Sequence, residues 1–92
     1  MWTMDKIRQQ IDRIDEELVK LLARRQRCVE QAIAVKKRDG IPARVPERIS
    51  EVIDNARTHA RTHHADPALI ETLWTEMVEW FVAYEEHSLK RK

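Results

Sequence analysis

The sequence has few residues that interrupt a helix or cross-link the chain. Its 92 residues include one glycine, three prolines and a single cysteine, Cys28. One cysteine excludes an internal disulfide framework and fits a reducing compartment. We interpret Cys28 as a small packing residue rather than a nucleophile. So few breakers among many helix-forming residues predict an all-α protein.

Other features are missing as well. The 17 basic and 16 acidic residues nearly cancel, so nucleic acid is not an expected partner. No apolar run is long enough to cross a membrane and no signal-peptide pattern is present, so we expect a soluble, cytoplasmic protein. The length predicts a single domain, residues 1–92.

The longest predicted helix begins between Thr3 and Asp5 and ends near Arg38, where Asp39-Gly40 stops it. Steps of four and three residues separate its apolar positions, as in a coiled-coil seam. These positions are Ile7, Ile11, Ile14, Leu18 and Leu21.

Two shorter helices follow. Pro42 excludes a continuous helix, and Pro46 suits the first turn of a second helix that frays near His63-His64. Asp66 as N-cap and Pro67 as first residue predict the start of a third helix. The apolar face of the second helix holds Ile49, Val52, Ile53, Ala56 and Ala60, and that of the third holds Ile70, Leu73, Trp74, Met77, Val78, Phe81 and Val82.

The length of the first helix predicts an assembly. Some 35 residues of helix are about 50 Å long, and the other two helices together cannot cover all of its faces. We therefore expect two chains to pair, long helix against long helix, as a homodimer.

Two cations interrupt the seam. Continued with the same spacing, it reaches Arg25 where a large apolar residue is expected, and Lys36 follows eleven residues later, about three full turns. Two like charges on a buried stripe are costly unless an anion lies between them, which favours an anion-binding site. The alternative is that acidic residues of another helix neutralise them, or that Lys36 extends to solvent.

One carboxyl group and two more cations are the remaining candidate residues of a functional site. Glu85 continues the apolar stripe of the third helix, where a protonated carboxyl could donate a hydrogen bond. Alternatively, that helix has ended and Glu85 is solvated or paired with Lys36. Arg8 lies about 25 Å from Arg25 along the helix and could reach its site only from a partner chain. Arg48 could join the anion site or form an exposed pair with Glu47 or Glu51.

Other kinds of site have weak support. His59 and His63 stand one turn apart and His64 is adjacent, yet no cysteine or acidic cluster completes a metal site, so none is predicted. Neither a glycine-rich phosphate loop nor a Ser-His-Asp or Cys-His arrangement is evident.

The chain resembles the all-helical chorismate mutase family over nearly its whole length. The matching residues are Ile7-Arg8, Ile11, Ile14-Asp15, Leu18, Leu21-Leu22-Ala23-Arg24-Arg25, Lys36 and the His63-His64-Ala65-Asp66 turn. The resemblance implies three helices per chain and an intertwined homodimer with two shared active sites. It places Arg8 from the partner chain, Arg25 on a substrate carboxylate, and Lys36 at the ether oxygen and a carboxylate. Arg48 occupies the family's second-helix arginine position, and Glu85 falls beside the breaking bond, where many members carry Gln.

The chain departs from this family at three substrate-contacting positions. Val45 and Ile49 stand where members carry acidic residues that contact the ring hydroxyl of the substrate, and Phe81 replaces a serine. The segments Ile41-Pro42-Ala43 and Pro46-Glu47-Arg48 look more like the family's isochorismate-pyruvate lyase branch.

The predicted function is therefore a cofactor-free chorismate mutase of aromatic amino acid biosynthesis, which rearranges chorismate to prephenate. The first alternative is an isochorismate-pyruvate lyase that uses the same pocket and releases salicylate and pyruvate. The second is a non-enzymatic helical dimerisation module, which explains the seam but not the two cations on it. Either enzyme would bind a small dicarboxylate substrate.

Overall fold

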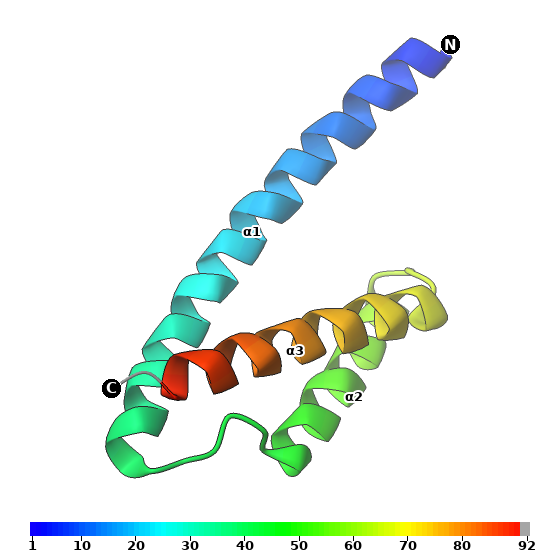
Figure 1. Ribbon diagram of the computed structural model, residues 1–92. Coiled ribbons are helices and arrows are strands. Elements are labelled where there is room, and N and C mark those ends of the chain that lie inside the picture. Colours follow the sequence, from blue (N-terminus) through cyan, green and yellow to red (C-terminus); the bar gives the residue numbers. More distant parts are fainter. Residues whose placement is uncertain (91–92) are drawn as a thin grey trace. The chain divides into compact units, whose positions relative to one another are not determined.

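A computed structural model describes residues 1–90 and contains three α-helices over that range (Figure 1). They are α1 (Met4–Asp39), α2 (Pro46–Thr62) and α3 (Pro67–Leu89). The predicted all-helical class and the three helix positions are confirmed. The chain divides into two compact units, of which the first is Met1–Ala32 and the second begins at Ile33.

The first unit is almost entirely α1. The helix starts where the backbone N–H of Lys6 donates to the Thr3 hydroxyl over 3.2 Å. We call the five seam residues the α1 apolar stripe; their exposed fractions run from 36% to 55%, and the stripe comprises Ile7, Ile11, Ile14, Leu18 and Leu21. No residue of α1 is buried. Cys28 is exposed too, so the structure of the single chain does not give it the packing role expected from the sequence.

Gly40 ends α1 as predicted. Its φ of 68° lies in the left-handed region, which only glycine adopts without strain. The turn lets the backbone N–H of Ile41 donate to the carbonyl of Lys36 over 2.9 Å. This bond satisfies one of the carbonyls that a helix end leaves open. The chain thereby turns sharply into residues 40–45, which link α1 to α2 and are called the connection below.

Helices α2 and α3 form a hairpin and lie side by side (Figure 1). Its buried apolar side chains are two alanines of α2 and two valines of α3, namely Ala56, Ala60, Val78 and Val82. Alanines on α2 let the two helices approach closely, and valines on α3 fill the space between them. Leu73, predicted to lie on this inner face, is 51% exposed, so that part of the prediction is wrong. Val78 and Val82, predicted on the same face, are buried as expected, and so is Glu85.

The turn between the two helices follows the local sequence signals. His64 adopts a φ of 59°, and the N–H of Ala65 donates to the carbonyl of Ala60 over 2.9 Å. Asp66 then caps α3 by accepting a bond of 2.8 Å from the N–H of Ala68, and Pro67 is the first helical residue. The predicted start of α3 is confirmed.

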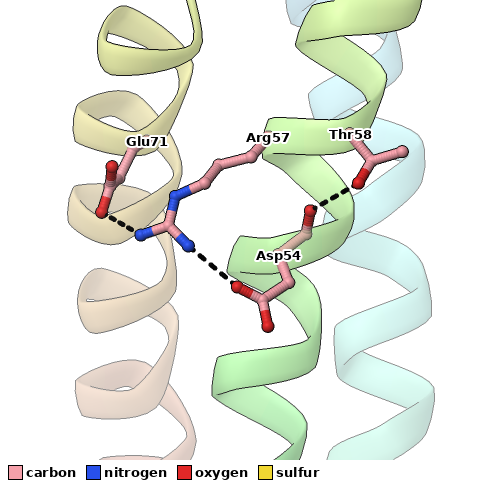
Figure 2. A network of polar contacts seen from close by, with 4 residues as sticks. All are labelled: Asp54, Arg57, Thr58 and Glu71. Carbon is pink, nitrogen blue, oxygen red and sulfur yellow. Dashed lines mark hydrogen bonds and ion pairs between the residues drawn. The ribbon is translucent and has the colours of Figure 1, made fainter.

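A polar network joins α2 to α3 on the outside of the hairpin (Figure 2). The guanidinium of Arg57 donates to Asp54 on its own helix over 2.8 Å and to Glu71 on α3. The hydroxyl of Thr58 donates to the backbone carbonyl of Asp54. The hydrogen bond from Arg57 lowers the pKa of Glu71 below its ordinary value. The network therefore favours the charged forms of both partners.

Two features are absent from residues 1–90. None of the helices is long and apolar enough to cross a membrane. Within the same range, no three side chains of His, Cys, Asp or Glu gather closely enough to hold a metal ion, the neighbourhood of His59 and His63 included.

Candidate active site

Lys36 and Glu85 meet inside the second unit. The ammonium nitrogen of Lys36 lies 3.3 Å from Oε1 of Glu85 and 3.5 Å from Oε2. Their side chains are only 19% and 10% exposed, and Glu85 is the one charged residue among residues 1–90 that is buried. Helix α3 continues to Leu89, so Glu85 is buried within the helix and paired with Lys36. The first alternative for Glu85, a place on the apolar stripe of the helix, predicted its burial. The second predicted its pairing with Lys36, but was wrong that the helix has ended before Glu85.

A second acceptor fixes the same ammonium group. Lys36 donates to the backbone carbonyl of Ala43 over 2.9 Å. Ala43 is itself buried, at 8% exposure, although it belongs to the connection rather than to a helix. An ammonium has three N–H donors, and these acceptors account for two of them. The cation is held close to one carboxylate and one carbonyl, in an environment partly withdrawn from water.

The connection is held at the next residue too. Arg44 donates to Glu79 of α3 through both arms of its guanidinium, over 3.0 and 2.7 Å. The bond lowers the pKa of Glu79 and raises that of Arg44. The two side chains are about half exposed. The connection is thus attached to α1 through Lys36 and to α3 through Glu79.

The remaining candidates on α2 lie at its first turn. Val45 is the N-cap residue, and the N–H of Ile49 donates to its carbonyl over 3.0 Å. Both side chains are half-buried. Arg48, in contrast, is exposed and pairs with Glu51, which matches the simpler of the two interpretations made for it. The structure gives Arg48 no contact with the Lys36–Glu85 pair.

On α3, Phe81 precedes Glu85 by one turn and is half-buried. It belongs to a small aromatic group: the rings of Trp80 and Phe81 meet edge to face with centroids 5.0 Å apart, and Trp80 stacks on Tyr84 at 5.5 Å. Arg8 and Arg25 belong to the first unit, where Arg8 is exposed. The cluster that the structure assembles therefore consists of Lys36, Glu85 and the connection.

The comparison with protein families supplies the deciding observation. The model of the family described as chorismate mutase type II matches residues 7–86, most of the chain. The chain belongs to the type II chorismate mutase family. No curated protein matches the chain closely enough to count as a relative.

Membership of the type II chorismate mutase family supports a chorismate mutase-like function on a small-molecule substrate. The match includes most of α1, with Arg8 and Arg25, and the pair at Lys36 and Glu85. It also includes the connection, whose contacts the sequence did not predict. A backbone carbonyl such as that of Ala43 has no sequence signature, and Arg44 and Glu79 are 35 positions apart with no pattern that joins them.

Proposed function

We propose that the protein is a chorismate mutase, which rearranges chorismate to prephenate. The observation that carries the proposal is the Lys36 ammonium, held close to Glu85 and partly buried, in a chain of this family. A cation in that position can stabilise a negative oxygen far better than a fully solvated lysine can. Among residues 1–90, no other carboxylate is as deeply buried as that of Glu85.

This reaction requires the enzyme only to orient the substrate and to stabilise charge electrostatically. The rearrangement is pericyclic: the ether C–O bond breaks as a C–C bond forms, with no nucleophile, metal or cofactor taking part. The enzyme must hold the enolpyruvyl arm over the ring. It must also stabilise negative charge that develops on the ether oxygen. Lys36 supplies a cationic donor for that oxygen, and Glu85 supplies a second whenever its carboxyl carries a proton.

The two substrate carboxylates need further cations. Arginine suits them because its planar fork can donate two parallel hydrogen bonds. We assign Arg25 to one carboxylate, with Arg48 on α2 and Arg8 as additional contacts. In this proposal Arg8 comes from a second copy of the chain, in an intertwined homodimer with shared sites. The exposed α1 apolar stripe supports the assembly, because five large apolar side chains in register otherwise face water.

A second activity, isochorismate-pyruvate lyase, is favoured by one specific feature. Val45, Ile49 and Phe81 place apolar side chains at the substrate-contacting positions where mutases of this family carry acids or serine. An apolar wall cannot hydrogen-bond a ring hydroxyl. The lyase would eliminate pyruvate from isochorismate and leave salicylate, with the same cations on the two carboxylates. A dimerisation module without activity is the third possibility, and it leaves the Lys36–Glu85 pair without a role.

One experiment tests all three. The purified protein is incubated with chorismate and, separately, with isochorismate, and the products are identified by chromatography. Prephenate from chorismate supports the mutase. Salicylate and pyruvate from isochorismate, without prephenate, replace it by the lyase. No turnover of either compound by a folded dimer leaves the dimerisation module. The variant Lys36→Met, which keeps the side-chain length and removes the charge, is the control for contaminating enzyme.

A further inference from the structure

The connection between α1 and α2 is attached at two consecutive residues to two different partners. The Ala43 carbonyl accepts a hydrogen bond from Lys36, and the Arg44 guanidinium donates two hydrogen bonds to Glu79. Glu79 pairs with Arg44 and Glu85 pairs with Lys36, and these two carboxylates lie six residues apart on α3, about 9 Å along its axis. The same rigid element therefore holds the connection through one carboxylate and Lys36 through the other.

The geometry of the Arg44–Glu79 pair suits a clamp. Each guanidinium arm donates to one of the two carboxylate oxygens, which fixes the direction of the side chains as well as their distance. Glu86 also contributes a favourable charge to Arg44, so the cation faces two acidic residues of α3. The pair is about half exposed, so its contribution should be modest and weakened by salt.

A lysine alone is poorly positioned. Its four-carbon side chain is flexible, and an ammonium imposes little directionality on its partners. The two acceptors of Lys36 set the direction of its remaining donor only if both stay in place. Glu85 is held by the backbone of α3. Ala43, in contrast, lies in a segment outside any helix, and its carbonyl stays in place only as well as that segment does.

We propose that Arg44 and Glu79 are positioning residues: their pair clamps the connection so that the Ala43 carbonyl stays on the Lys36 ammonium and aims its remaining N–H donor. The inference rests on the proposed function, because it assigns the clamp to the residue that would stabilise the reacting oxygen. Neither Arg44 nor Glu79 needs to touch the substrate. The clamp acts through the backbone of a single neighbouring residue.

The variants Glu79→Gln and Arg44→Gln test the kinetic consequence. Each should lower kcat by about three- to tenfold and leave KM nearly unchanged, because a misaimed donor weakens the transition state more than it weakens binding. Arg44→Lys keeps the charge but not the fork and should fall between these variants and the wild type. Glu76→Gln, which removes an exposed carboxylate of α3 three residues away, is the matched control and should behave as the wild type.

Hydrogen exchange gives a readout that does not need activity. In Glu79→Gln, the backbone amides of residues 43–45 should exchange about threefold faster or more, while those of the buried part of α3 keep their rates. Unchanged exchange at these amides would overturn the clamp. Faster exchange with an unchanged kcat would overturn its positioning role. A wild type inactive on both chorismate and isochorismate, but with clamp-dependent exchange, would defeat the proposed function and leave the clamp standing.

Discussion

At the residue scale, the site depends on one ammonium group that already has two acceptors within the chain. Lys36→Met should reduce turnover about 100- to 1,000-fold, as expected when a donor to a developing oxyanion is lost. It should also lower stability by about 1–3 kcal/mol, because the carboxylate of Glu85 loses its ion-pair partner in a partly buried position. Steady-state kinetics and thermal unfolding measure the two losses.

The double variant Lys36→Met/Glu85→Gln separates these effects. It removes the uncompensated charge, so stability should return toward that of the wild type while turnover stays low. Recovery of turnover along with stability would mean that Lys36 only holds the fold together.

Glu85 allows a second comparison at this scale. A glutamine keeps an N–H donor at this position at every pH, whereas a carboxyl donates only while it is protonated. Glu85→Gln should therefore retain turnover, because the amide keeps a donor there, and Glu85→Ala, which has no donor, should turn over poorly. The measurement is the steady-state turnover of the three proteins. Equal turnover in Glu85→Ala and Glu85→Gln would remove Glu85 from the list of donors.

The sequence predicted part of this site. Lys36 and Glu85 could be named because a charged residue on an apolar helical stripe is conspicuous, and their mutual pairing was one of the alternatives considered. The clamp could not be predicted. Arg44 and Glu79 are ordinary surface residues on a chain that is 36% charged, and only the fold selects which of many possible partners meet.

At the scale of elements, the α2–α3 hairpin links stability to pH through Arg57 and Glu71. The hydrogen bond lowers the pKa of Glu71 below its ordinary value of 4.5. A lowered pKa adds stability that is present above that ordinary value and is lost as the pH falls through the value in the folded state. The melting temperature of the wild type should thus decrease as the pH is lowered below about 4.5. Glu71→Gln should be less stable than the wild type at pH 7 but should lose less stability on acidification.

Circular dichroism melts between pH 7 and pH 3 check this result, and Glu76→Gln again serves as the control. A steeper acid loss in Glu71→Gln than in the wild type would contradict the assigned sign. The two side chains are 33% and 44% exposed, so solvent weakens the interaction and its effect on the midpoint should be a few degrees at most.

Helix boundaries were the most predictable feature of these elements. Gly40, Pro46 and Asp66-Pro67 act through the local backbone, so each helix begins or ends where those residues require. Which apolar residues become buried was less predictable. Leu73 fits the helical periodicity yet is exposed, because the face of α3 that is covered depends on where α2 packs.

At the scale of the whole molecule, the proposed shared site predicts complementation. Arg8→Ala and Arg25→Ala should each be nearly inactive alone. After subunit exchange, a mixed dimer regains one site with both arginines intact, so an equimolar mixture should recover about a quarter of wild-type activity. Activity assays before and after mixing test this, with exchange verified by mass spectrometry of isotope-labelled chains. Exchange without recovery would place both arginines in the same chain's site.

Disruption of the α1 apolar stripe is the matching test of assembly. Leu18→Glu puts a charge on a side chain that is 51% exposed in the single chain, so a monomeric protein would tolerate it. In a dimer that buries the stripe, the same charge is costly and the species measured by sedimentation should shift toward the monomer. An unchanged species with normal helicity would show that the stripe is not the interface.

The absence of buried residues along α1 has a thermodynamic consequence. A helix that buries nothing within its own chain derives little stability from tertiary packing. If association supplies the missing burial, folding and assembly become one equilibrium, and dilution acts as a denaturant. Each tenfold fall in protein concentration would then remove about 1.4 kcal/mol of apparent stability. The melting temperature would be a property of the solution rather than of the chain, and any ranking of variants would require a single fixed concentration.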